Sequence, residues 1–296
     1  MRLATVRRSV DGRTALFVGT ADGYVDLALA ARALEVEGIG DVADVGELYR
    51  AGDAAVARVA RIAESLPAAE VPATHLTELR LAPPVTRPDS IVCIGRNYLE
   101  HIREGNADVP PYPILFSKYP NTLVGHEDEV RHHRLTEQLD YEGELAVVIG
   151  RRAGRIPAAR AMEVVAGYTI LNDISARDLQ YGDVQWIRGK SLDTWGPVGP
   201  VFVTADEIPD PHALRLQTRV NGELRQDASC SDMIFKIPEL IEFITEGITL
   251  RPGDLISTGT PSGVGMGFDP PRWLRPGDVL EVTIEPIGTL RSTIVE

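Results

Sequence analysis

The segment LDYEGELAVVIG, residues 139–150, combines a run of apolar residues with two glutamates near its start. If it forms a strand, the alternation of side chains places Glu142 and Glu144 on one face, together with Ala146 and Val148. Both faces are apolar further along, so the strand would be buried on both sides and would begin with two like charges. Such a pair needs protonation, a basic partner or a metal cation. The alternative is a solvated strand end, at which both glutamates face water.

A second segment, GYTILNDISARDLQ at residues 167–180, offers a third carboxylate. Its apolar strand runs into Asn172 and Asp173, and Ser175 is then placed to cap a helix. Asp173 has an alternative role as a turn residue that hydrogen-bonds its own backbone. Joined to the two glutamates, it would complete an all-oxygen ligand set, which Mg²⁺, Ca²⁺ and Mn²⁺ prefer and Zn²⁺ does not.

Two further segments carry groups that could transfer protons or stabilise negative charge. In IVCIGRNYLEHIRE, residues 91–104, a helical stretch after a buried strand places His101 and Glu104 at positions i and i+3. A carboxylate so placed can orient an imidazole as a general base, although a histidine on a surface helix is often only solvated. Lys190 lies between a glycine and a serine, where a lysine is usually exposed, but it could stabilise a developing oxyanion.

The composition predicts a globular protein that acts on small molecules. Of the 296 residues, 44% are hydrophobic and 25% are charged, a balance typical of globular chains. Acidic residues outnumber basic ones by 43 to 30, which disfavours nucleic acids and anionic membranes as partners. Two cysteines without a CxxC spacing, and the lack of a bilayer-length apolar stretch, predict a soluble cytoplasmic protein.

The chain is predicted to contain two domains of α+β class. Residues 1–75 combine a small strand meander with a helix that begins near Asp53, and they form a small N-terminal α+β domain. Residues 76–90 include a proline-rich stretch and are expected to form a linker. Residues 91–296 hold most of the short strand-like runs and only a few helices, so the larger domain is expected to be dominated by strands.

In this order the segments resemble the fumarylacetoacetate hydrolase (FAH) superfamily, in the form of a bacterial member with an N-terminal accessory domain. The motifs that carry the resemblance are IVCIGRNYLEHIRE, LDYEGELAVVIG, GYTILNDISARDLQ, RGKSLDTWGPVGP and GDLISTGTPSGVG. The resemblance implies that residues 91–296 form a catalytic domain with a mixed β-roll or pseudo-barrel fold. It also implies that the protein is a homodimer.

The resemblance further implies a set of site residues. It assigns Mg²⁺, Mn²⁺ or Ca²⁺ binding to Glu142, Glu144 and Asp173. It assigns catalysis to His101, Glu104 and Lys190, and contact with a 2-oxo acid substrate to Arg177, Gln180 and Thr260. Some family members take a fourth metal ligand from an aspartate before the first motif. This chain has Asn97 nearby, so three protein carboxylates are expected.

The reaction expected first is hydrolytic cleavage of a C–C bond in a β-diketo acid of the acylpyruvate or fumarylpyruvate type. The same site can serve as an isomerase or tautomerase of an unsaturated 2-oxo diacid of the 2-hydroxyhepta-2,4-diene-1,7-dioate type. It can also serve as an oxaloacetate tautomerase or decarboxylase, because all these reactions pass through a stabilised enolate. A non-catalytic binding protein with the same fold is disfavoured because His101 and the three carboxylates are all present. The motifs alone do not choose among the reactions.

Overall fold

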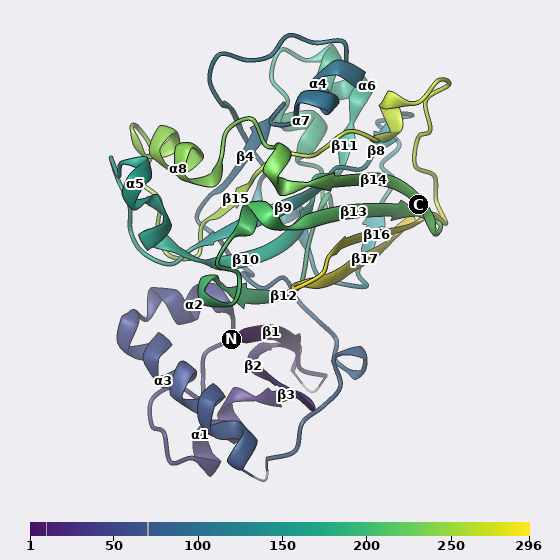
Figure 1. Cartoon of the computed structure of the whole chain (residues 1–296). Coiled ribbons are helices and arrows are strands. Elements are labelled where there is room, and N and C mark those ends of the chain that lie inside the picture. The colour runs from purple at the N-terminus through teal and green to yellow at the C-terminus, as the bar shows by residue number, and fades with distance from the viewer. Residues whose placement is uncertain (10, 70) are drawn as a thin grey trace.

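The computed structural model describes residues 1–9, 11–69 and 71–296 (Figure 1). The N-terminal part begins with the expected meander, whose two turns contain Gly12 at φ 68° and Gly23 at φ 138°. The predicted helix begins at Asp53, with Gly52 rather than Asp53 as its N-cap residue. The elements of this part are β1 (Arg2–Arg7), β2 (Thr14–Thr20), β3 (Gly23–Asp26), α1 (Leu27–Ala33), α2 (Val45–Arg50) and α3 (Asp53–Ser65).

The largest sheet runs through both parts of the chain, in the order β3-β2-β1-β12-β10-β9-β15-β4-β5, and β6 also pairs with β12. Strand β1 pairs antiparallel with β12 through Leu3 and Phe202, so the N-terminal strands extend the sheet of the larger part. The remaining strands of this sheet are β4 (Ile91–Gly95), β5 (Ile114–Ser117), β6 (Leu123–Val124), β9 (Gly143–Ile149), β10 (Val165–Asn172), β12 (Gly196–Thr204) and β15 (Leu255–Ser257).

The proline-rich segment between the two parts is packed against them. Residues 81–85 are buried, and Val6 forms a β-bridge with Leu81. This burial and pairing are unlike a free linker. The domain boundaries at 75 and 91 stay a prediction.

A second sheet of five strands lies beside the first, in the order β14-β13-β16-β17-β7, and β8 pairs with β11. These strands are β7 (Glu129–Arg131), β8 (Leu139–Asp140), β11 (Ser175–Ala176), β13 (Arg215–Val220), β14 (Glu223–Ser229), β16 (Val279–Ile284) and β17 (Gly288–Val295). The sheets combine parallel and antiparallel pairs and, among the described residues, do not close into a barrel. The predicted α+β class and mixed β-roll architecture are confirmed.

Strand β9, which begins at the site, is fully enclosed. It lies between β10 and β15, and each of its seven residues is buried. Its predicted burial on both faces is therefore confirmed. The helices of this part of the chain are α4 (Leu99–Glu104), α5 (Ala158–Ala161), α6 (Arg177–Gly182), α7 (Ile187–Lys190) and α8 (Ile237–Thr245). Helices α4, α6 and α7 gather at the end of the molecule away from the N-terminal part (Figure 1).

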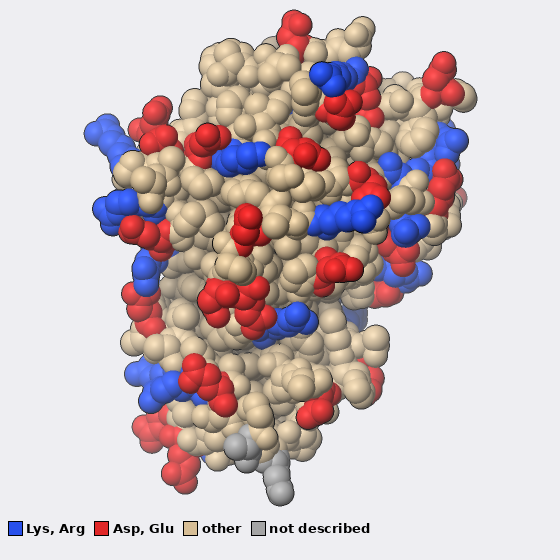
Figure 2. Space-filling view, viewed as in Figure 1, with Lys and Arg blue, Asp and Glu red and all other residues tan. Residues whose placement is uncertain are grey.

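The surface shows no single dominant charge on the face seen in Figure 2, where acidic and basic side chains are interspersed. Among the described residues, no helix combines the length and apolar character that a membrane span requires.

We expect Leu3→Ala to lower the free energy of unfolding by about 2–5 kcal/mol, because it leaves a cavity in a fully buried cluster that includes Phe202. Since β1 belongs to the main sheet, the loss should shift one cooperative transition, measured by urea unfolding. The control Leu29→Ala removes a side chain that is 47% exposed on α1 and should change stability by no more than about 0.5 kcal/mol. Two separate transitions would show that the N-terminal part unfolds on its own.

Candidate active site and metal centre

Three carboxylates meet where β9 begins and β10 ends. The two strands are antiparallel, with Leu171 opposite Glu144, and the amide of Asp173 donates to the carbonyl of Glu142 at 2.8 Å. Glu142, Glu144 and Asp173 are 5%, 1% and 0% exposed, and one oxygen from each lies within 4.8 Å of the others. The burial rules out a solvated strand end. Ser175 does not cap helix α6 as predicted, because its hydroxyl donates to the carbonyl of Asp173.

Two buried lysines neutralise this cluster. Lys190 Nζ donates to Glu142 Oε2 at 2.8 Å and to Asp173 Oδ2 at 2.9 Å. Lys118, which follows β5, donates from Nζ to Asp173 Oδ1 at 2.6 Å, to the carbonyl of Ile174 and to that of Lys190. Lys190 is therefore not the exposed loop residue that its neighbours in the sequence permit. The basic partner that the buried glutamates require is present.

Arg177 links the cluster to a fourth buried carboxylate, that of Asp140. Its Nε lies 2.8 Å from Asp140 Oδ2, and its Nη1 lies 2.5 Å from Glu142 Oε1. Nη1 also donates to Gln180 Oε1 at 3.0 Å. Asp140 in turn accepts hydrogen bonds from the amides of Gly265 and Met266, at 2.6 and 3.1 Å. The Asp140 carboxylate thus holds both Arg177 and the glycine-rich loop of residues 259–267 in place.

The two glutamates have opposite protonation tendencies. Burial raises the pKa of Glu142, but the charges of Lys190 and Arg177 outweigh it and lower this pKa to about 2. Burial, with the nearby Asp173 and Glu142 carboxylates, raises the pKa of Glu144 well above its usual range. Glu144 receives both of its hydrogen bonds on Oε2, from Ser257 Oγ at 2.5 Å and the Gly259 amide at 2.9 Å.

The donor set fits a hard divalent cation. Every candidate ligand atom is a carboxylate oxygen, which is the chemistry that Mg²⁺, Mn²⁺ and Ca²⁺ share. Within the described part of the chain, Glu144 Oε1 accepts no hydrogen bond and is available as a ligand. A divalent cation would also offset the mutual repulsion that raises the pKa of Glu144.

The His101–Glu104 pair lies across from the carboxylates on helix α4. His101 Nδ1 is 2.8 Å from Glu104 Oε1, and both side chains are largely buried. Glu104 Oε2 also accepts the amide of Gly263, at 2.9 Å, which fixes the carboxylate between the helix and the glycine-rich loop. The imidazole is therefore held by Nδ1, and its Nε2 remains for chemistry.

A narrow cavity of about 30 Å³ connects these groups. Six of the nine predicted site residues line it, namely His101, Glu142, Arg177, Gln180, Lys190 and Thr260. Aromatic side chains and Arg96 complete the wall. The predicted catalytic and substrate-binding residues thus meet in one place, with Glu104 behind His101 and with Glu144 and Asp173 behind Glu142.

Several site residues were not predicted from the sequence. Lys118 and Asp140 belong to the ion-pair network, and Gln226 accepts the amide of Gly143 and donates to Thr260 Oγ1 at 2.8 Å. The rarity of lysine in this sequence is a signal that could have drawn attention to Lys118. The chain has only three lysines among its 30 basic residues, and two of them are buried at the site.

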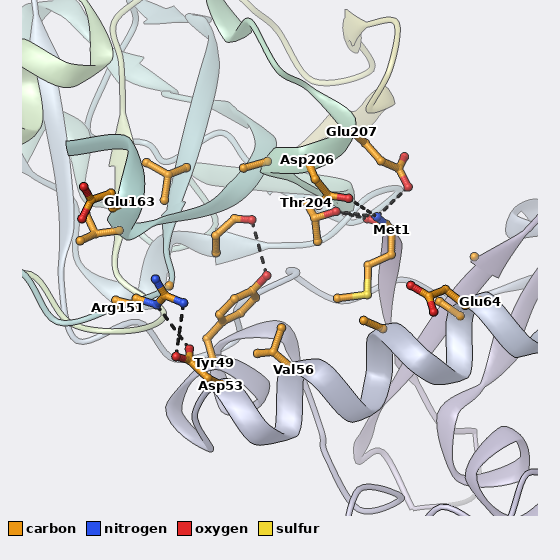
Figure 3. Close-up of a pocket in the computed structure, with 18 residues that line it drawn as sticks. Met1, Tyr49, Asp53, Val56, Glu64, Arg151, Glu163, Thr204, Asp206 and Glu207 are labelled. Atoms are coloured by element: carbon orange, nitrogen blue, oxygen red, sulfur yellow. Dashed lines mark hydrogen bonds and ion pairs between the residues drawn. The ribbon is translucent and has the colours of Figure 1, made fainter. Parts of the chain in front are cut away.

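A larger cavity of about 640 Å³ lies where the N-terminal part meets the rest of the chain (Figure 3). Arg151 pairs there with Asp53 at 3.3 Å, and the hydroxyl of Tyr49 lies 3.5 Å from the carbonyl of Ala166. None of the predicted site residues lines it. Its contacts join the two parts of the chain.

Residues 90–295 match the family model described as fumarylacetoacetate (FAA) hydrolase C-terminal. The fold and the buried carboxylates thus belong to a known class of enzymes, and the chain is a member of this family. The resemblance noted from the motifs is confirmed.

Individual relatives differ in the activity that their names state. The chain is 55% identical to an oxaloacetate tautomerase, YisK, from Bacillus subtilis. The match extends over 223 residues and covers 74% of each protein. The chain is similar to the solved structure of a fumarylacetoacetate hydrolase from Exiguobacterium antarcticum, with a TM-score of 0.84, 37% identity and coverage of 100% of this chain and 99% of the other. A 2-hydroxyhepta-2,4-diene-1,7-dioate isomerase from Mycobacterium marinum has a TM-score of 0.74, 34% identity and coverage of 100% and 98%. The predicted homodimer and cytoplasmic location stay predictions.

Cation binding is expected to release a proton from Glu144. The raised pKa keeps Glu144 protonated at pH values at which an ordinary glutamate is ionised. A cation that binds there must displace this proton, so the affinity of the protein for the cation should rise with pH. Calorimetric titration with Mn²⁺ in buffers of different ionisation enthalpy measures the release. Glu144→Gln should bind Mn²⁺ weakly and without this proton.

The matched variant is Glu142→Gln. Glu142 is already ionised because its pKa is about 2, so this variant should lose affinity but keep a proton release. Equal proton release by the wild type and by Glu144→Gln would contradict the assignment.

Lys118→Met should lower the free energy of unfolding by about 3–5 kcal/mol, because it leaves the fully buried Asp173 with one ion-pair partner fewer. Urea unfolding in the presence of a chelator measures the loss. Arg188→Met, which removes the exposed pair with Asp183, is the control and should have a much smaller effect. Equal losses in the two variants would show that the buried pair is not important for stability.

Proposed function

We propose that the protein is a divalent-metal-dependent tautomerase that interconverts the enol and keto forms of oxaloacetate. The observation that carries the proposal is the 55% identity over 223 residues to a relative named as an oxaloacetate tautomerase. The site supports it, because a histidine held by a carboxylate faces a cavity lined by a lysine and by Glu142, one of the three candidate metal ligands. Between the reactions that the motifs leave open, these comparisons favour tautomerisation over C–C hydrolysis.

Glu142, Glu144 and Asp173 are the residues that would hold the cation, for the reasons of donor chemistry and burial given above. When bound, a divalent cation supplies Lewis acidity that makes a 2-oxo acid more easily enolised. The remaining chemistry is proton transfer, which the protein's own side chains provide.

His101 is the group that we assign to proton transfer at carbon 3 of the substrate. Ketonisation breaks the O–H bond of the enol and forms a C–H bond at carbon 3, so the reaction moves protons and consumes no water. His101 delivers the proton to carbon 3 in this direction and removes it in the reverse direction. Glu104 holds Nδ1 and so orients the ring, which leaves Nε2 for the proton transfer.

Lys190 and Gln180 are assigned to the negative charge on the substrate oxygen. Burial lowers the pKa of Lys190, but Asp173 and Glu142 outweigh it and raise this pKa, so the side chain stays an ammonium. A buried ammonium already held in place stabilises an oxyanion without reorganisation. Gln180 accepts from Arg177 through its Oε1, which leaves its amide N–H groups for the substrate.

Hydrolysis of a β-diketo acid is the second candidate, favoured by the similarity to the solved fumarylacetoacetate hydrolase. It would use the same residues, with His101 deprotonating a water instead of transferring a proton to carbon. The difference is measurable, because only hydrolysis inserts an oxygen from solvent into a product.

His101→Asn should lower kcat for ketonisation of oxaloacetate by about 10²–10⁴-fold, because it removes the proton-transferring group. The loss of enol absorbance with time, in the presence of Mn²⁺, measures the rate. Mn²⁺ affinity should be unchanged, since His101 is not among the candidate ligands. Unchanged turnover in this variant would refute the role of His101.

The same preparation separates the two candidate reactions. With acylpyruvates in ¹⁸O-labelled water, a tautomerase releases no free acid. Release of pyruvate together with a labelled carboxylic acid would instead establish the hydrolase.

A further inference from the structure

Arg96 occupies a backbone conformation that is unusual for its residue type. It joins β4 to helix α4 at φ 55°, in the left-handed region that glycine adopts more easily. The next residue, Asn97, fixes this turn, since its side chain donates to the carbonyls of Thr258 and Phe235 and accepts the amide of Phe235. The fold therefore holds Arg96 in a strained position at the cavity wall, where such conformations are often functional.

Arg96 also differs from the other basic side chains that line the cavity. Lys190 and Arg177 are each bonded to two carboxylates, and His101 is bonded to Glu104. Arg96 forms no ion pair with any carboxylate in the described ranges. Its guanidinium carbon lies 5.8 Å from the centroid of the Trp186 ring, an interaction that leaves the N–H groups available.

A second unpaired donor lies in the same cavity. The Nη2 of Arg177 is buried and, in the part of the chain that the structure describes, has no hydrogen-bond partner. An unsatisfied buried guanidinium nitrogen is costly, so a bound acceptor would stabilise it. Among the described residues, the cavity thus contains one cation without an ion-pair partner and one unsatisfied donor, and each of them favours an anionic ligand.

We infer that Arg96 binds the second carboxylate of a short 2-oxo dicarboxylate and sets the preference for dicarboxylates over monocarboxylates. The inference rests on the proposed function, in which the 2-oxo acid end of the substrate would meet the cation that Glu142, Glu144 and Asp173 would hold. The other cations of the cavity are already paired, so a second carboxylate entering it finds Arg96 as its unpaired partner. Charge-assisted hydrogen bonds from a guanidinium to a carboxylate are among the stronger polar contacts in proteins.

The test compares oxaloacetate with its 4-amide, 2-oxosuccinamate, which has the same shape but lacks the second negative charge. The full-length protein with Mn²⁺ is assayed for ketonisation of both, and binding of both is measured by calorimetry. Arg96→Met should lower kcat/KM for oxaloacetate roughly 10- to 100-fold, mainly through KM, and change the value for the amide far less. Arg96→Lys should restore part of the preference, because it restores the charge.

Arg103→Met is the matched control. Arg103 lies on the neighbouring helix, is 64% exposed and pairs with Glu100, so the variant makes the same charge change outside the cavity. It should leave the ratio of the two substrates unchanged. Thermal unfolding of Arg96→Met should show no loss of stability, since the substitution removes no ion pair.

The outcomes separate the inference from the proposed function. If Arg96→Met weakens both substrates equally, or neither, Arg96 does not select dicarboxylates. If the wild type accelerates ketonisation of neither substrate, the proposed function is wrong. The role of Arg96 in selecting dicarboxylates is then tested by calorimetry alone. The inference is supported if the wild type binds the dicarboxylate more tightly than the amide and if Arg96→Met abolishes this difference. It is overturned if the wild type binds the two 2-oxo acids equally or binds neither.

Discussion

Burial of negative charge is the constraint on which this structure depends. Asp140, Glu142, Glu144 and Asp173 are all at most 5% exposed, and charges in such surroundings are stable only when they are paired or bound to a cation. Lys118, Arg177 and Lys190 pair with Asp140, Glu142 and Asp173, and they come from three separate segments of the chain. Glu144 has a raised pKa and is held by hydrogen bonds from Ser257 and the Gly259 amide. The requirement for compensation therefore ties together elements that are distant in sequence.

The sheet provides the positions that make this compensation possible. Antiparallel pairing of β9 with β10 places the start of one strand beside the end of the other, and β15 brings Ser257 and the Gly259 amide to Glu144 from the opposite side. Pairing with β10 on one edge and β15 on the other holds the register of β9, and a shift by one residue would turn both glutamates to the other face and remove them from the cluster. The packing of the core thus fixes the geometry of the candidate metal centre.

Local spacing was enough to predict the Glu142–Glu144 pair and the His101–Glu104 pair, whereas the assignment of Asp173 to the same cluster came from the resemblance of the motifs. Period-two alternation places Glu142 and Glu144 on one face, and helical spacing places His101 beside Glu104. Lys118 and Gln226 were missed because their roles depend on contacts across 55 and 34 residues, to Asp173 and Thr260 respectively. The joining of β1 to β12 was missed for the same reason, since no local pattern reports which distant edge a strand will pair with. Ser175 was misassigned because a serine before a helix has a second option, a bond to a nearby carbonyl, that spacing does not exclude.

The division between paired and unpaired groups also explains why the motifs identify a family and not a reaction. Residues of the ion-pair network are required in any member that buries these carboxylates, so their presence carries no information about the substrate. Discrimination must come from cavity groups whose bonding capacity is not already used within the protein. These are the free nitrogen of His101, the amide of Gln180, the guanidinium of Arg96 and the aromatic wall that includes Trp186. Relatives with the same network can therefore differ in reaction, and we expect substrate preference to vary with these few positions.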